Sequence, residues 1–346
     1  MVNALTNGGI IFIKKGVYNI SRTINISAPV IIEGEGPDWF GTHGTYLKGS
    51  NILNFEFPSM MYMPMVRNIQ FSVAPSSYAI RLGKNVSDII IEKVAAHGGI
   101  GVLIDGGVNG WIKNCWLETG DYGIRAISGG TGFFIESNRF YNNKYASISL
   151  ENYALIRMHI RHNTFAKDRQ VSINIDATEV HISDNIIEDA GQDALNAYNA
   201  IVIKIRGPIS IHGNKITGSG TRYGINIIGD SANARVSIKN NIFGVFGTKA
   251  INLVSGLIGV YEIKSNIGYV TENRGTATFS GDGITTQFKI AHGLAGTPKV
   301  AIVTPASNDA KGTFYVTVDA TYIYVNYATA PPASTNNVVL MWYAEM

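Results

Sequence analysis

Three carboxyl groups in the middle of the chain are the first candidates for chemistry. Glu151 follows the segment SISL, Asp176 follows SINI, and Asp193 lies in EDAGQDA. Hydrolysis of a glycosidic bond needs two carboxyl groups, about 5 Å apart for retention of configuration or roughly 6.5 to 9.5 Å apart for inversion. Glu151 with Asp176, or either with Asp193, could supply such a pair. Two carboxylates this close repel each other, which is expected to raise one pKa towards that of a general acid.

Elimination from a uronic acid residue is the alternative chemistry. It needs a base such as Lys, Arg, His or Tyr close to a group that neutralises the carboxylate of the sugar. Arg125 or Tyr145 would serve beside a divalent cation such as calcium, held by Glu151 and Asp176. For hydrolysis we expect no cofactor and no metal.

The side chains around these carboxyl groups are of types that bind sugars. Amide and guanidinium groups bond to hydroxyls, and aromatic rings pack on the faces of sugar rings. The candidates for substrate binding are Arg125, Tyr145, Arg169, Asn174, Asn196, Tyr198 and Arg222.

The elements that must position these residues form a repeat. One pattern recurs between Trp111 and Glu262, in WIKNCWL, FIESNRF, HIRHNTF, HISDNII, SIHGNKI, SIKNNIF and EIKSNIG. Its second residue is apolar with polar neighbours, as in a strand with one buried face. Each period also contains a second short strand. Two or three short strands per period of about 21 to 29 residues predict an all-β fold, a parallel β-helix whose coils stack at about 4.8 Å.

Stacking places equivalent residues of successive coils in columns. One column is polar and is expected to bond along the turns: Asn138, Asn163, Asn185, Asn214, Asn241 and Asn266. A second is expected to form surface ion pairs: Lys113, Glu136, Arg161, Ser183, His212, Lys239 and Lys264. His159 and His181 would stack on adjacent coils. A metal site made by these two histidines is the alternative to a purely structural stack.

The second strands define the candidate site. The residue before their inward isoleucine is always small, which predicts a flat outer shelf formed by Ala79, Gly101, Gly123, Ser147, Ser172, Ala194, Gly224 and Ala250. In this alignment Glu151 and Asp176 are stacked neighbours, while Asn196 and Tyr198 follow Asn174 and Asp176 on the next coil. The segments before these strands would overhang one margin of the shelf. Such a trench suits an extended glycan, and packing against another subunit is the alternative.

The N-terminal part of the chain resembles the pectate-lyase-like right-handed β-helix superfamily, especially its viral tailspike and depolymerase branch. The resemblance rests on GGIIFIKKGVYNISRTINI, VIIEGEG and GTYLKGS together with the coil repeats. In relatives an amphipathic helix precedes the double glycine, so we expect VNALT to be its last turn and an attachment segment to precede it. The motifs of polygalacturonases and the Trp-Ile-Asp-His segment of pectate lyases are absent. The resemblance therefore implies a polysaccharide depolymerase of unassigned bond specificity, homotrimeric and located on a virion tail or outside the cell.

The last part of the chain follows a different pattern. The β-helix is predicted for residues 1–273, and residues 275–346 alternate with period two between Gly, Pro and Asn turns. This pattern predicts a separate antiparallel β-sandwich. FSGDGITTQFKIAHGLAGTP is similar to the small C-terminal module of phage tail fibres, which implies trimerisation or glycan binding. A cap over the open end of the β-helix is the alternative.

Composition and charge exclude several classes of function. Charged residues make up 15% of the chain and the net charge is +3, so no basic surface for nucleic acid is expected. The single cysteine, Cys115, cannot form an intramolecular disulfide. We see no signal peptide and no apolar run long enough to span a membrane, and therefore expect no membrane insertion. The expected function is polysaccharide cleavage, with a non-enzymatic virion or adhesion protein of the same fold as the alternative.

Overall fold

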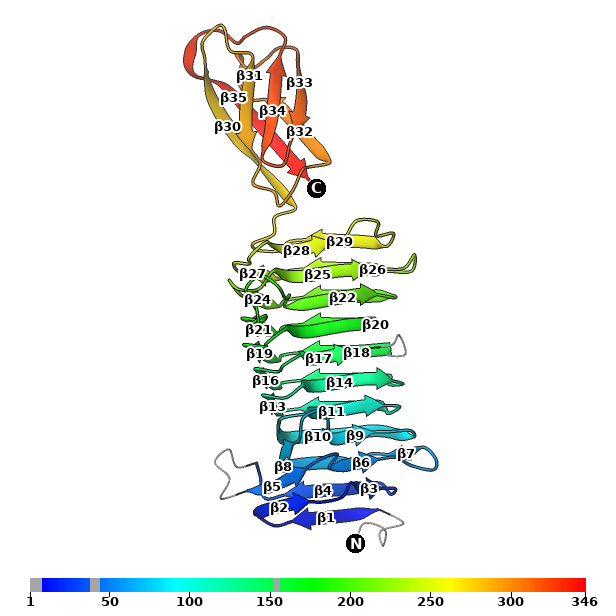
Figure 1. The fold of residues 1–346 in the computed structure, drawn as a ribbon. Coiled ribbons are helices and arrows are strands. Elements are labelled where there is room, and N and C mark those ends of the chain that lie inside the picture. Colours follow the sequence, from blue (N-terminus) through cyan, green and yellow to red (C-terminus); the bar gives the residue numbers. More distant parts are fainter. Residues whose placement is uncertain (1–7, 38–43, 152–155) are drawn as a thin grey trace. The chain divides into compact units, whose positions relative to one another are not determined.

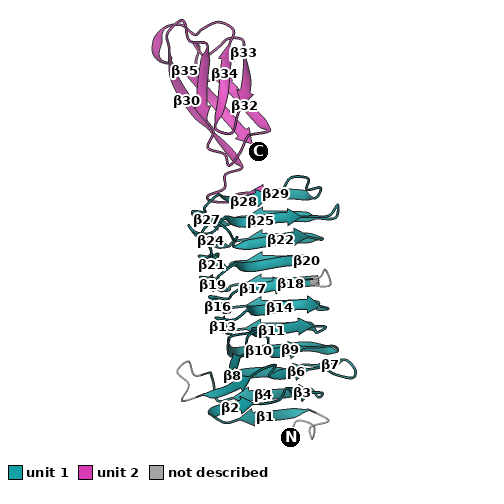
Figure 2. Ribbon diagram, viewed as in Figure 1, with its two compact units in different colours: residues 1–262 teal, residues 263–346 magenta. Residues whose placement is uncertain are grey.

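The computed structural model describes residues 8–37, 44–151 and 156–346. The segment VNALT lies outside these residues. The chain divides into two compact units, Met1–Glu262 and Ile263–Met346 (Figure 2). Among the described residues, no helix is long and apolar enough to cross a membrane.

Unit 1 is a parallel β-helix of about 10 turns (Figure 1). Its strands form three faces, because each coil contributes up to three short strands that pair in parallel with those of the coils before and after it. Face 1 contains β3 (Ile24–Ile26), β6 (Leu53–Phe55), β9 (Tyr78–Leu82), β11 (Ile100–Asp105), β14 (Tyr122–Ser128), β17 (Ala146–Leu150), the first half of β20 (Val171–Ser183), β22 (Ile201–Ile205), β25 (Tyr223–Gly229) and β28 (Lys249–Leu253).

The other two faces follow face 1 in each coil. Face 2 contains β1 (Gly9–Ile13), β4 (Val30–Gly34), the first parts of β8 (Met65–Val73) and β10 (Val86–His97), β12 (Val108–Lys113), β15 (Phe133–Glu136), β18 (Ile156–Arg161), the second half of β20, β23 (Pro208–His212), β26 (Arg235–Lys239) and β29 (Val260–Lys264). Face 3 contains β2 (Gly16–Ile20), β5 (Thr45–Gly49), the last parts of β8 and β10, β13 (Trp116–Glu118), β16 (Arg139–Tyr141), β19 (Thr164–Ala166), β21 (Ile186–Glu188), β24 (Lys215–Thr217) and β27 (Ile242–Phe243). The short strand β7 (Met61–Tyr62) pairs with the start of β10.

The core consists of stacked apolar side chains that point inward from all three faces. On face 2 these are Ile112, Ile135, Ile160, Ile182, Ile211 and Ile238, and all of them are buried. On face 3 the rings of Phe140 and Phe165 stack with centroids 4.8 Å apart. Each rung therefore buries its inward side chains against the same residue types above and below, which stabilises the stack through burial of apolar area.

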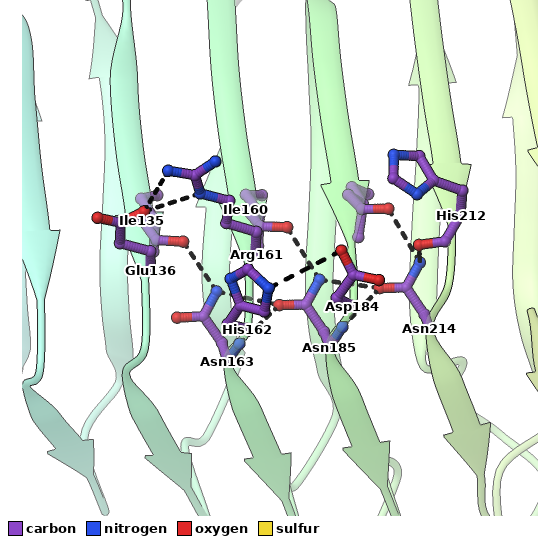
Figure 3. A network of polar contacts seen from close by, with 11 residues as sticks. Ile135, Glu136, Ile160, Arg161, His162, Asn163, Asp184, Asn185, His212 and Asn214 are labelled. Carbon is purple, nitrogen blue, oxygen red and sulfur yellow. Dashed lines mark hydrogen bonds and ion pairs between the residues drawn. The ribbon is translucent and has the colours of Figure 1, made fainter.

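The asparagine column lies at the turn from face 2 to face 3, as the repeat predicts. The backbone N–H of Asn163 donates to Oδ1 of Asn185 (2.9 Å), and its amide Nδ2 donates to the carbonyl of Ile135 (2.8 Å) and to Oδ1 of Asn185 (3.0 Å). The same bonds recur along the column (Figure 3). Because these side chains are buried, the ladder satisfies backbone groups that would otherwise have no partner.

The small residues of the second strands do not form an outer shelf, and this prediction was wrong. Gly101, Gly123, Ser147 and Ser172 are buried. A Cβ atom at Gly123 would lie 2.6 Å from the ring of Phe140. These residues stand at the corner where the chain enters face 1, and there two consecutive side chains face the core. They are small because large side chains from face 3 occupy that space.

The predicted rung at Ala194 is also wrong. The strand that continues face 1 is β22, in which Asn174 pairs with Val202 and Asp176 pairs with Lys204. Asn196 and Tyr198 belong instead to a loop between β21 and β22. The small Ala194 resembles the corner residues of other coils, but the inward isoleucines of β20 stack on Ile201 and Ile203, whose burial decides the register.

Unit 2 is an antiparallel β-sandwich. One sheet has the order β30 (Glu272–Gly281), β35 (Ser334–Glu345), β32 (Val300–Pro305), and the other has β31 (Gln287–Ala291), β34 (Tyr322–Tyr327), β33 (Phe314–Val318). Side chains alternate along each strand, and the inner ones form a core that includes Phe288, Ile323, Val325, Val338 and Leu340. This confirms the sandwich expected from the period-two pattern.

Candidate functional site

The outer surface of face 1 brings Glu151 and Asp176 together. Ser149 pairs with Asn174 and Leu150 with Ile175, so Glu151, which follows β17, stands one rung from Asp176. Both line a pocket of about 270 Å³ together with Asn174, Lys204 and Ile228. We call it the face 1 pocket. This neighbourhood of the two carboxyl groups is the one that the columns predict.

Glu151 is held by an arginine from the preceding rung. Nε and Nη2 of Arg125 donate to its two carboxylate oxygens at 2.9 and 3.0 Å, and Oγ of Ser149 donates to Oε1 at 3.0 Å. The guanidinium of Arg125 also lies over the ring of Tyr122, 4.8 Å from its centroid. Arg125 therefore links the carboxyl group to an aromatic surface at the start of the strand.

Asp176 is held by two cations from the following rung and corner. Nε of Arg206 donates to its Oδ1 at 2.8 Å, and Nζ of Lys204 lies 3.4 Å from Oδ2. The hydrogen bond from Arg206 holds the pKa of Asp176 below its usual value, and the positive charges of Arg206 and Lys204 act in the same direction. The rise in pKa expected from carboxylate repulsion does not occur at Asp176, because these two cations lower this pKa.

The lyase roles expected for these residues fit the structure poorly. The hydrogen bonds that Arg125 donates to Glu151 raise the pKa of Arg125, so this guanidinium remains protonated and cannot act as a base. A calcium ion would have to displace Arg125, Arg206 and Lys204 from the two carboxylates, so these oxygens do not fit a cation site. Tyr145 is exposed, and its ring lies 5.4 Å from that of Tyr122.

Asp193 lies too far from the pocket to pair with Asp176. Its backbone N–H donates to the carbonyl of Arg169, and its carboxylate pairs with Arg169 at 2.7 Å. Arg169 precedes β20, whereas Asp176 lies five residues beyond the first residue of that strand. About 17 Å of extended chain therefore lies between the start of β20, near which Asp193 is held, and Asp176. A catalytic pair that includes Asp193 is excluded by this separation.

The remaining candidates lie along the same margin as Asp193. Arg222 packs its guanidinium 4.9 Å from the ring centroid of Tyr223, at the start of β25. Asn196 is exposed in the loop, where its backbone N–H donates to the carbonyl of Gly220. Neither Asn196 nor Tyr198 is among the residues that line the face 1 pocket. Their expected place beside Asn174 and Asp176 is taken by Val202 and Lys204.

Four residues of the site escaped the sequence interpretation: Tyr122, Ser149, Lys204 and Arg206. Lys204 was hidden because IVIKI was not recognised as the rung of β22. Tyr122 pairs with Ile100, which pairs with Tyr78, and the return of tyrosine at this position two coils apart was a usable signal. Arg206 could not be found by spacing, because it reaches Asp176 from a corner outside the strand.

The histidine stack on face 2 is structural. The rings of His159 and His181 are 4.9 Å apart and only 8° from parallel. Their nitrogen lone pairs lie in the ring planes and therefore cannot converge on one ion. Among the described residues, no group of three or more His, Cys, Asp or Glu side chains is placed to hold a metal ion.

Solved structures with the same fold include phage proteins. ORF18 of Geobacillus virus E2 has 14% identity and a TM-score of 0.57, with 98% of this chain and 69% of that one covered. The tailspike gp61 of Pseudomonas phage phi297 has 9% identity and a TM-score of 0.50, with 92% and 67% covered. The mannuronan C-5 epimerase AlgE6 A-module of Azotobacter vinelandii has 14% identity and a TM-score of 0.48, with 77% and 92% covered. At these identities the likeness to the two phage proteins shows the fold alone.

A family model describes most of unit 1. No curated protein matches the chain in sequence. The model described as "Right handed beta helix region" matches residues 43–243, more than half of the chain, and this range includes Glu151 and Asp176. The chain belongs to the right-handed β-helix family.

Proposed function

We propose that this protein is a tailspike-like depolymerase, which binds an extended bacterial polysaccharide on face 1 and cleaves it at the face 1 pocket. The observation that carries the proposal is the pocket itself, where two carboxyl groups on adjacent rungs meet polar side chains. Arginine, lysine, asparagine and serine supply hydrogen bonds for hydroxyls, and Tyr122 and Tyr145 supply rings at the strand starts.

The two carboxyl groups take different roles in this proposal. Asp176, whose pKa is held low, is ionised and acts as the nucleophile at the anomeric carbon. Glu151 donates a proton to the leaving oxygen as the glycosidic C–O bond breaks. It then takes a proton from the water that releases the sugar from Asp176. Adjacent rungs are about 4.8 Å apart, which corresponds to the closer carboxyl spacing and hence to retention of configuration.

This assignment makes one demand on the substrate. Glu151 can carry a proton only when its carboxylate is released from the two hydrogen bonds with Arg125. A glycan hydroxyl or carboxylate that binds the guanidinium would release it. We therefore expect Arg125 to bind substrate directly, in agreement with its place beside the pocket.

A non-enzymatic receptor-binding protein is the second candidate, and the ion pairs favour it. Both carboxyl groups of the pocket are already paired with side-chain cations. A surface of this kind binds a glycan without needing to cleave it. In either case we propose a location on a virion tail or outside the cell.

The quaternary structure proposed is a homotrimer, and face 2 supplies its support. The column Ile10, Ile31, Met65 and Ile90 runs along the outside of this face; Ile10 is 63% exposed and the other three are half-buried. Partly exposed apolar columns of this kind are found on surfaces covered by another subunit. Light scattering of the purified protein should give three times the chain mass of 37.4 kDa, and a monomer mass would contradict the trimer.

The test of the enzyme is incubation with a panel of bacterial exopolysaccharides. Release of reducing ends reports cleavage by either hydrolysis or elimination. Ultraviolet absorbance reports only the unsaturated product of an elimination. We expect reducing ends without a rise in absorbance. A rise in absorbance would replace hydrolysis with elimination, and binding without cleavage would establish the non-enzymatic candidate.

A further inference from the structure

A second hollow lies on a different edge of the β-helix, at the turn from face 2 to face 3. Its volume is about 620 Å³, more than twice that of the face 1 pocket. The side chains that line it and matter here are Lys93, Asn114, Trp116, Ser137, Arg139 and His162. We call it the turn hollow. Nothing in the proposed cleavage at face 1 uses it.

The hollow is long because it follows the coil axis. Asn68, Lys93, Asn114, Ser137 and His162 occupy the same turn position in five successive coils, all with left-handed backbone conformations. Five rungs span about 19 Å between the first and the last. The left-handed turn holds these side chains at the protein surface, while the buried column beside them begins with Val94, Cys115 and Asn138.

Positive charge gathers in the turn hollow. Lys93 and Arg139 are both exposed. His162 is not counted with them, because its Nε2 lies 4.0 Å from Oδ2 of Asp184. None of the lining residues that the structure describes carries a carboxylate. The ion pairs of the described residues likewise leave Lys93 and Arg139 without an acidic partner, in contrast to the cations of the face 1 pocket.

Arg139 is oriented by an aromatic ring. Its guanidinium lies over Trp116, 4.4 Å from the ring centroid, because the two residues pair across β13 and β16. Stacking restricts the side chain and leaves the N–H groups at the edge of the guanidinium free to face a ligand. A planar guanidinium held in this way matches a carboxylate or a sulfate, which it can bind through two parallel hydrogen bonds.

We propose that the turn hollow is a binding site for an acidic oligosaccharide. Arg139 and Lys93 bind the carboxylate or sulfate groups of the sugar, and Asn114 and Ser137 bind its hydroxyls. The length of the hollow suits a chain of sugars along the coil axis. Because the hollow is separate from face 1, it would hold a polymer at the protein surface without taking part in its cleavage.

The experiment compares an acidic with a neutral ligand of equal length. Tetragalacturonic acid and maltotetraose are titrated into the full chain by calorimetry at low salt. We expect binding of the acid only. Arg139→Gln and Lys93→Gln should each weaken this binding by about tenfold, because each removes a charge-assisted contact. Arg139→Lys should give an intermediate loss, since lysine keeps the charge but lacks the planar fork.

Two controls separate the turn hollow from other surfaces. Lys215→Gln removes a lysine from the same outward column of face 3, outside the hollow, and should leave the affinity unchanged. Lys311→Gln removes an exposed lysine of unit 2 and should also leave the affinity unchanged. Equal affinity of wild type and Arg139→Gln, equal binding of the two ligands, or loss of binding in Lys311→Gln would each overturn the proposal. Polysaccharide cleavage by Arg139→Gln tests face 1 independently, so either idea can fail alone.

Discussion

Face 1 and face 2 both carry ion pairs between adjacent rungs on their outer surfaces, but the pairs are arranged differently. On face 2 the charges alternate in one column, with Arg67 against Glu33 at 2.8 Å and Arg161 against Glu136 at 2.7 Å. On face 1 the pairs converge from several columns on one pocket. An alternating column neutralises itself, whereas convergent groups leave donors and acceptors directed at a common space. Convergence is therefore the better criterion for a site than charge alone.

The buried polar columns at two corners of the β-helix also differ from each other. At the turn from face 2 to face 3 the polar column consists of amides, each of which both donates and accepts. At the turn from face 3 to face 1, Asn143 is followed by the buried carboxyl group of Asp168, which accepts hydrogen bonds from the backbone N–H of Asn143 and from Ser147. The amide ladder does not titrate, whereas the second corner depends on pH.

The largest effect is expected from the face 1 carboxyl groups. Glu151→Gln or Asp176→Asn should lower the rate of polysaccharide cleavage by about 10² to 10⁴, because proton transfer or nucleophilic attack is lost while shape is kept. The midpoint of thermal unfolding should change little, since both side chains lie at the surface. Wild-type rates in both variants would move the active site away from this pocket.

The next effect concerns the amide ladder. Asn163→Ala removes the acceptor of the Asn138 backbone N–H and the donor to the carbonyl of Ile135, both buried. Leaving such groups without partners should lower the free energy of unfolding by about 3 kcal/mol. Urea unfolding at fixed protein concentration measures the loss. Thr164→Ala, in the following residue, should cost less than about 0.5 kcal/mol, and equal costs would show that the ladder contributes nothing.

The second corner gives a pH-dependent effect. Burial raises the pKa of Asp168 to about 6, above about 3.9 in an unfolded chain. Between these values the folded state binds a proton that the unfolded state releases, so stability falls as pH rises through this range. Asp168→Asn should remove this cost and stabilise the protein by about 3 kcal/mol at pH 8, with little change near pH 4. A difference that does not vary with pH would contradict the prediction.

The fold was predictable because its signals recur in every coil. A buried isoleucine, a turn and an asparagine repeat often enough that one exception, such as Cys115 in the asparagine column, does not hide the period. The candidate site was only partly predictable. Glu151 and Asp176 lie in two regular coils, so their neighbourhood followed from the spacing. The next coil contains an additional loop before β22, and for this reason the spacing wrongly aligned Asn196 and Tyr198 with Asn174 and Asp176.

The failures at the site share a physical cause. Spacing gives backbone register, but it does not give the direction of a side chain at a corner or the partner that a long side chain reaches. Arg206 reaches Asp176 from such a corner and thereby lowers the pKa that two facing carboxylates were expected to raise. The small residues of the supposed shelf lie at corners too, where the alternation of inward and outward residues is interrupted.

The smallest effect tests the comparison of the two faces most directly. Glu136→Gln breaks the pair with Arg161 on face 2 (Figure 3), in which the side chain of Arg161 is 43% exposed. Glu151→Gln breaks the corresponding pair with Arg125 on face 1. Exposed pairs contribute at most about 1 kcal/mol, so thermal unfolding should shift slightly, and the shift should shrink in 1 M salt. Cleavage should proceed at the wild-type rate, because neither Glu136 nor Arg161 lines the face 1 pocket. A loss of cleavage comparable to that of Glu151→Gln would mean that the glycan contacts face 2 as well, and that convergence of charged groups does not distinguish the site from the alternating column.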